Sequence, residues 1–98
     1  MAGQLIWSPT ARLDLQEIFS YIAGNDADAA RRFMLGLFDA VERLPSFPES
    51  GRIVPELDDP MIREIIRRPC RIVYRLKPDD KTIEIARVWH AARGIPEI

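Results

Sequence analysis

Residues that build disulfides or metal sites are almost missing from this sequence. It contains one cysteine, Cys70, and one histidine, His90, in 98 residues. A single cysteine cannot close an internal disulfide, and one cysteine with one histidine cannot supply the four ligands of a structural zinc site. We therefore expect no metal and no cofactor. A lone thiol also fits the reducing conditions of the cytoplasm.

Long apolar runs are missing as well. No stretch approaches the roughly 20 apolar residues that a membrane-spanning helix needs. Residues 1–7 lack the basic start and apolar run of a signal peptide, so we expect a cytoplasmic protein with no membrane contact. The chain is long enough for one core only, and residues 1–98 are expected to form a single domain. Its content of 47% hydrophobic and 30% charged residues is typical of a folded globular protein.

The chain has almost no net charge, but its cations are unevenly distributed. The formal net charge of −1 argues against a general nucleic-acid coat protein. Residues 61–77 nevertheless combine one acid, Glu64, with six cations: Arg63, Arg67, Arg68, Arg71, Arg75 and Lys77. Such a patch indicates an anionic ligand, an acidic partner segment, or simply a solvated strand face.

The first half of the chain predicts a short strand followed by two helices. The apolar run at residues 5–7 favours a strand. Ser8 can cap a helix that has Pro9 in its first turn. Apolar residues follow at helical spacing: Ala11, Leu15, Ile18, Phe19 and Ile22. After Gly24, either Asn25 or Asp26 can cap a second helix, which ends before Pro45 and carries its own apolar stripe: Phe33, Leu37, Val41 and Leu44.

The second half predicts strands. Residues 53–54 can begin one that Pro55 interrupts or confines to an edge, residues 62–67 follow an acidic turn, and residues 78–81 form a hairpin loop. Residues 70–76 alternate, with one apolar face (Ile72, Tyr74, Leu76) and one cationic, open face (Arg71, Val73, Arg75). Residues 82–90 form the last strand, whose alternation fails at 86–88, which indicates a bulge or burial of both faces. We predict the α+β class in the order β-α-α-β-β-β, with a helical hairpin packed on a small antiparallel sheet.

Four segments in this order resemble the ParE/RelE toxin superfamily of type II toxin–antitoxin systems. They are residues 11–22, 48–52, 71–75 and 88–93, so the resemblance runs over essentially the whole chain. It implies a toxin neutralised by a small antitoxin, whose C-terminal part wraps the toxin and whose N-terminal part binds operator DNA. RelE-like members of this superfamily cleave messenger RNA on the ribosome. ParE-like members inhibit DNA gyrase by binding.

A nuclease of this kind needs a general base, a proton donor and cations for the phosphate. His90 could exchange protons near neutral pH, and Arg71, with Arg87 or Arg93, could hold a phosphate. The resemblance implies that Arg71 occupies a position used catalytically in RelE-like enzymes. Residues 48–57, however, contain no lysine and only one cation, and the tail after Arg93 carries neither a tyrosine nor a basic helix.

We therefore interpret the chain as a ParE-like gyrase inhibitor without catalytic residues. A net acidic charge also argues against a ribosome-acting protein, because RNA affinity comes chiefly from phosphate neutralisation. Two alternatives remain open. One is a ribosome-dependent mRNA endonuclease, and the other is a non-toxic co-repressor that only partners an antitoxin.

Two surfaces are expected from this interpretation. The acidic C-terminal segment of the antitoxin should meet the cationic strand face in a toxin–antitoxin hetero-oligomer, while its apolar anchors fill a groove beside the helical hairpin. The predicted antitoxin-binding residues are Arg63, Arg67, Arg71 and Arg75. The predicted target-binding residues are Trp89, His90 and Arg93. Trp89 is open to two interpretations, an exposed contact anchor or a cap on the edge of the core.

The remaining apolar side chains are expected to be structural. We assign five aromatic residues to the core: Trp7, Phe19, Phe33, Phe38 and Tyr74. Cys70, beside Pro69, is expected to be a small buried residue. Residues 94–98 should lie over the surface. They either belong to the target-binding tip, the end of the chain that carries Trp89, His90 and Arg93, or pack on the core through Ile95 and Ile98.

Overall fold

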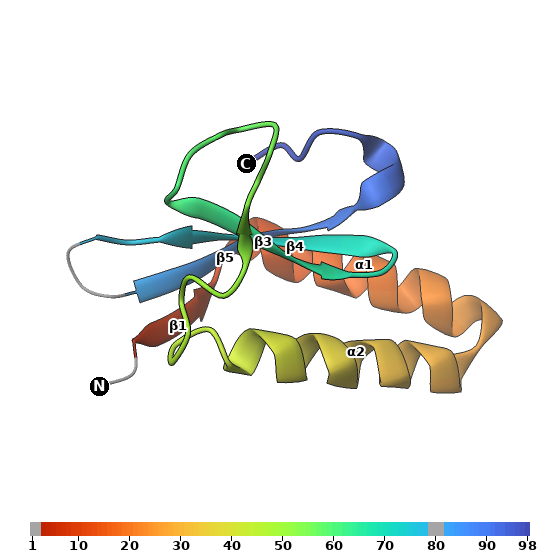
Figure 1. Ribbon diagram of the computed structural model, residues 1–98. Coiled ribbons are helices and arrows are strands. Elements are labelled where there is room, and N and C mark those ends of the chain that lie inside the picture. Colours follow the sequence, from red (N-terminus) through yellow and green to blue (C-terminus); the bar gives the residue numbers. More distant parts are fainter. Residues whose placement is uncertain (1–2, 79–81) are drawn as a thin grey trace.

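The computed structural model describes residues 3–78 and 82–98, which form a five-stranded sheet with two helices on one face (Figure 1). The elements are β1 (Gln4–Trp7), α1 (Pro9–Asn25), α2 (Ala27–Glu42), β2 (Arg52–Ile53), β3 (Ile62–Arg67), β4 (Cys70–Leu76), β5 (Thr82–His90) and a short 3₁₀ helix, η1 (Ala91–Arg93). The α+β class and the helical hairpin on one side of the sheet are thereby confirmed. The hairpin loop expected at residues 78–81 falls mostly outside the described residues.

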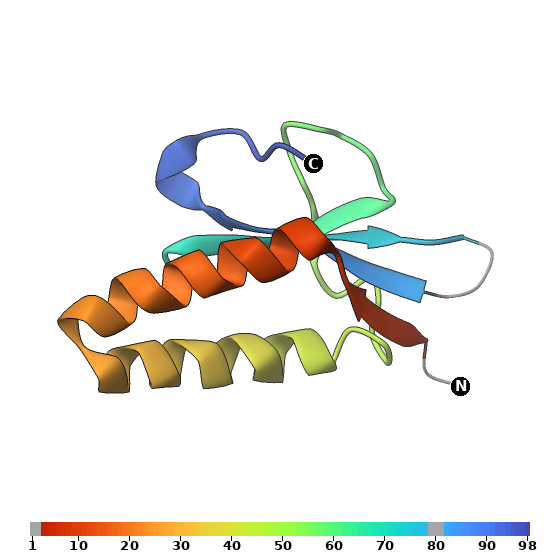
Figure 2. The ribbon, with the colours of Figure 1, turned by 180° about the vertical axis from the view of Figure 1, so that it is seen from behind.

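The sheet differs from the expected one in two respects. Its strand order is β1-β5-β4-β3-β2, and β1 runs parallel to β5, whereas the other pairs are antiparallel. The prediction of a purely antiparallel sheet was therefore wrong. Parallel neighbours need a long crossover connection. Here most of the sequence, including the helical hairpin, connects the end of β1 to the start of β5 (Figure 2). Four strands rather than the expected three follow the helices. The additional one is the edge strand β2, which is only two residues long.

Both helix starts are capped as the sequence predicts. The Ala11 N–H donates to the Ser8 hydroxyl over 3.0 Å, and Pro9 is the first helical residue. Asp26, rather than Asn25, caps α2, since its carboxylate accepts from the Ala29 N–H at 3.1 Å. Local hydrogen bonds of this kind depend on residues three apart, which is why the sequence identifies them.

The main core lies between the helices and the sheet. The apolar stripe of α2 and the apolar face of β4 meet there, with Phe33, Ile72 and Tyr74 in one buried cluster. Phe19 and Phe38 were wrongly assigned to the core, because both side chains are exposed. Two helices in a single layer leave one side of each helix in solvent. Phe38 still makes an edge-on contact with the half-buried Trp7, with ring centroids 5.8 Å apart.

The last strand contains a bulge, which is one of the two explanations that its broken alternation left open. Val73 pairs with Arg87, and the next residue, Tyr74, pairs with Ile85, so Ala86 is an extra residue in β5. Its carbonyl accepts a hydrogen bond from the Ser8 hydroxyl at 2.9 Å. After the bulge, Arg87 pairs with Val73 and so lies on the sheet face opposite Tyr74 and the main core.

That second face is covered rather than open. Residues 54–60 and the tail, residues 91–98, arch over it on the side opposite the helices (Figure 1). Val54, Val73 and Trp89 are buried there, so both faces of the central strands are shielded from water. The prediction of an open cationic face on β4 was therefore wrong. Nowhere in the described chain is a helix long and apolar enough to cross a membrane.

Candidate functional site

Arg71 lies at the centre of the covered face and binds two carboxylates. Its side chain is 9% exposed. Nε donates to Glu64 at 2.6 Å, while Nη1 and Nη2 donate to the two oxygens of Glu56 at 2.9 and 2.6 Å. The forked pair with Glu56 is the strong geometry for a guanidinium and a carboxylate. All three nitrogens of Arg71 are thus directed at internal acceptors.

The two carboxylates extend this contact into a chain of alternating charges. Glu64 is fully buried and also accepts from Arg52 Nε at 2.6 Å. The hydrogen bonds from Arg71 lower the pKa of Glu56 from 4.5 to about 2. Hydrogen bonds to Glu56 and Glu64 in turn raise the pKa of Arg71. We call Glu56, Arg71, Glu64 and Arg52 the buried ion network; it ties residues 54–60 to the sheet.

The other arginines predicted to bind an antitoxin are also engaged within the chain. Arg63 donates to three backbone carbonyls, those of Glu49, Gly51 and Pro60. Arg67 crosses to α2, where it donates to the Arg32 carbonyl and lies against Gly36, a position at which a Cβ would collide with it. Arg75 pairs with Glu84 at 3.0 Å. The four arginines therefore make four separate internal contacts rather than one open patch.

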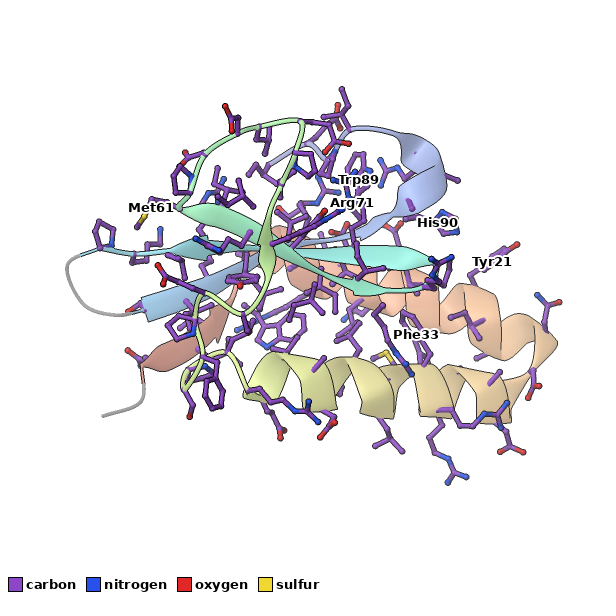
Figure 3. All side chains as sticks on the ribbon, viewed as in Figure 1. Tyr21, Phe33, Met61, Arg71, Trp89 and His90 are labelled. Atoms are coloured by element: carbon purple, nitrogen blue, oxygen red, sulfur yellow. The ribbon has the colours of Figure 1, made fainter. Side chains whose placement is uncertain are left out.

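The C-terminal tip is built around Trp89, which is only 2% exposed. The guanidinium carbons of Arg87 and Arg93 lie 4.8 and 4.0 Å from its ring centroid. Its indole N–H donates to the Gly94 carbonyl at 3.1 Å. Trp89 thus caps the edge of the core, and the interpretation as an exposed anchor is wrong. Figure 3 shows Trp89 and Arg71 on the face away from the helices, with Phe33 on the helix side.

Of the three predicted target-binding residues, His90 and Arg93 are exposed, whereas Trp89 is buried. His90 Nδ1 accepts from the Ala92 N–H at 3.1 Å, so the neutral ring carries its hydrogen on Nε2. Among the described residues, no carboxylate lies within ion-pair distance of Arg93. The tip therefore presents a cation and an imidazole to solvent.

Arg87 is held by an acid that the sequence analysis missed. Its Nε and Nη2 donate to the two oxygens of Asp14 at 2.8 and 2.9 Å, and Asp14 also accepts from the Val88 N–H at 3.0 Å. The hydrogen bond to Asp14 raises the pKa of Arg87. Asp14 falls on the stripe of α1 that carries Ala11 and Ile18. A carboxylate at a core-facing position was the signal that could have identified it.

Two open hollows lie beside the tip. One is a groove of about 340 Å³ between α1 and the end of β5. Its walls carry Ile18, Tyr21, Ile22, Val88, His90 and Arg93. The other is a wide hollow of about 570 Å³ at the β3–β4 turn, which Arg71, His90 and Arg52 help to line.

The candidate nuclease residues are therefore only partly brought together. Arg71 and His90 border the same hollow, while His90 and Arg93 border the groove. Arg87 lines neither of them. Burial raises the pKa of the Cys70 thiol to about 11, which keeps it protonated and inert. Residues 3–78 and 82–98 hold no cluster of three metal-ligating side chains.

Comparison with known proteins gives consistent matches over nearly the whole chain. A family model described as ParE toxin of type II toxin-antitoxin system, parDE, matches residues 5–95. A Sinorhizobium fredii relative named "Putative toxin Y4kP" is 33% identical over 94 residues, which cover 94% of this chain and 92% of the relative. A solved chain described as a chromosomal ParDE TA system from P. aeruginosa shares the fold, with a TM-score of 0.74 and 22% identity over 91% of this chain and 96% of that one. The chain belongs to the ParE toxin family of type II toxin–antitoxin systems.

Proposed function

We propose that this chain is a toxin that inhibits DNA gyrase by binding it and does not cleave RNA. The observation that favours binding over RNA cleavage is the state of Arg71, the arginine expected to clamp a phosphate in a nuclease. Its three nitrogens already donate to Glu56 and Glu64. Turning it toward RNA would leave a fully buried carboxylate, Glu64, with one partner fewer, at a cost of several kcal/mol.

The target-binding surface in this proposal is the exposed part of the tip. His90 and Arg93 offer hydrogen-bond donors to a protein surface, while the Trp89 ring packs against the Arg93 guanidinium. Arg93 is already stacked, so it loses little freedom on binding. This preorganisation suits recognition by contact, which needs no proton exchange.

The second part of the proposal is an antitoxin partner that neutralises the toxin. Membership of a toxin–antitoxin family supports such a partner, and so does a solved relative described as a ParDE system. The groove between α1 and β5 fits its apolar anchors, since Ile18, Ile22 and Val88 lie there. An acidic side chain of its C-terminal segment would pair with Arg93 on the rim. Operator DNA would be bound through the antitoxin.

The four arginines first expected to bind the antitoxin contribute less in this arrangement. Arg63, Arg67 and Arg71 are engaged inside the chain, and Arg75 exposes 36% of its side chain beside Glu84. Charges at the rim of an interface change mainly the association rate. Arg75→Ala should therefore alter the on-rate of the antitoxin more than its off-rate.

The proposal is tested by two assays on the purified chain. Gyrase supercoiling should be inhibited, and messenger RNA in programmed ribosomes should stay intact. Arg93→Ala should relieve the inhibition, whereas Arg43→Ala, which removes an exposed arginine just after α2, should not. Cleavage of messenger RNA in the ribosomal A site that disappears in His90→Ala would contradict the proposal.

A second candidate is the ribosome-dependent endonuclease. One observation favours it: Arg71 and His90 border the same hollow. It requires Arg71 to leave the buried ion network when RNA binds. The co-repressor alternative is tested separately, because it predicts no growth arrest when the chain is produced without an antitoxin.

A further inference from the structure

We propose that Asp14 is a positioning residue that holds the C-terminal tail in place through Arg87 and so presents Arg93 at the tip. This inference deepens the proposed function, because it assigns a role to a helix residue outside the target-binding surface. It rests on contacts that link α1, β5 and the tail in one path.

The first link joins α1 to β5. Asp14 and Arg87 are both nearly buried, with 11% and 14% of their side chains exposed. Two parallel hydrogen bonds of 2.8 and 2.9 Å fix the guanidinium plane. The bond from the Val88 N–H fixes the carboxylate on the strand just after the bulge. Arg87 therefore has one orientation, set from α1.

The second link joins Arg87 to the tail. Its remaining nitrogen, Nη1, donates to the Glu97 carbonyl at 2.8 Å, and the guanidinium lies over the Trp89 ring. Trp89 in turn donates to the Gly94 carbonyl and carries Arg93 on its ring. Two carbonyls of the tail are thus held by side chains of β5.

The tail has few apolar contacts of its own to replace this path. Ile95 and Ile98 are both exposed, and Pro96 is its buried residue. Packing of the two isoleucines on the core, which the sequence left open, is therefore wrong. With little apolar burial to fix it, the tail depends on hydrogen bonds to Arg87, Trp89 and Arg71.

Asp14→Asn tests the path by removing the charge while keeping the shape of the side chain. Trypsin binds its substrate as an extended segment, so we expect cleavage after Arg93 to require that the Gly94 and Glu97 carbonyls leave their hydrogen bonds. The release of residues 94–98 is followed by intact-mass spectrometry. We expect release at least about tenfold faster than in the unmodified chain, equivalent to about 1.4 kcal/mol of local stability. Cleavage at the arginines of α2 should stay slow. The matched control is Asp39→Asn, which breaks an exposed aspartate–arginine pair at the C-terminal end of α2 and should change nothing.

An unchanged release rate in folded Asp14→Asn overturns the inference. If circular dichroism shows that this variant does not fold, Arg87→Lys decides instead. A lysine keeps the charge beside Asp14 but cannot reach both Asp14 and the Glu97 carbonyl, so faster tail release supports the inference and an unchanged rate refutes it.

Growth arrest supplies the functional measurement. Asp14→Asn should weaken growth arrest when the chain is produced without an antitoxin, whereas Asp39→Asn should not. Full arrest by a variant that releases its tail refutes the positioning role. If the unmodified chain causes no arrest, the proposed toxic function fails, and the trypsin rates still test whether Asp14 holds the tail.

Discussion

Replacing Arg71 by methionine should reduce stability much more than it changes any binding surface. Methionine keeps much of the apolar volume but removes the charge between Glu56 and Glu64. Glu64 is fully buried and would retain only Arg52, whose own side chain is 58% exposed. Removing one partner of a buried ion pair costs 3–5 kcal/mol, and the remaining contact to Arg52 favours the lower end, about 3 kcal/mol.

That loss is large for a domain of this size. A small domain is stable by roughly 5–15 kcal/mol in total. Each kcal/mol lowers the melting temperature by about 4–8 °C, so Arg71→Met should melt about 12–24 °C lower. Urea unfolding followed by circular dichroism measures the free energy directly. Arg43→Met is the matched control: it breaks an ion pair whose two side chains are both 70% exposed, and should cost less than about 1 kcal/mol.

A double substitution separates the ion network from simple loss of packing. In Arg71→Met/Glu64→Gln the buried acid is neutral and no longer needs a cation. The double variant should therefore be at least about 1 kcal/mol more stable than the sum of the two single changes predicts. The reasoning is refuted if Arg71→Met costs less than about 1 kcal/mol. In that case Arg71 would be free to bind RNA or an antitoxin, as the sequence first indicated.

Two further measurements test the buried groups. Glu56 has a folded-state pKa of about 2, below its ordinary 4.5. Its contribution to stability is therefore complete above about pH 5 and is lost as the pH falls from there toward 2. In Glu56→Gln, the free energy of unfolding measured with urea should fall less steeply over this pH range. Cys70 is buried with its pKa raised to about 11, so a thiol reagent at pH 8 should label it only as fast as the chain opens, and labelling at the rate of a free thiol in the native protein would contradict its burial.

Local interactions made several parts of the fold predictable. Ser8 and Asp26 cap helices through residues three positions on, and the apolar stripe of α2 follows helical spacing. The break at Ala86 in an alternating strand indicated the bulge. These features depend on neighbours in sequence, so the periodicity of side chains reveals them without knowledge of the fold.

Predictions about exposure failed where distant segments meet. The alternation in β4 placed Arg71 correctly on the face opposite Tyr74, but it could not reveal that residues 54–60 bring Glu56 over that face. Asp14 and Arg87 lie 73 residues apart, and no local pattern links them. The same holds for the parallel pairing of β1 with β5.

The sequence by itself determined the family, the α+β class and the starts of both helices, because N-caps, turns and side-chain periodicity depend on residues that are close together in the chain. Only the tertiary structure decided which charges are available to a partner. The sequence does not show whether the guanidinium of an arginine faces water or a carboxylate. Arg71 and Arg87 became internal because the 54–60 segment and α1 placed acids within hydrogen-bond distance, whereas Arg93 stayed on the surface because none of the described acids reaches it.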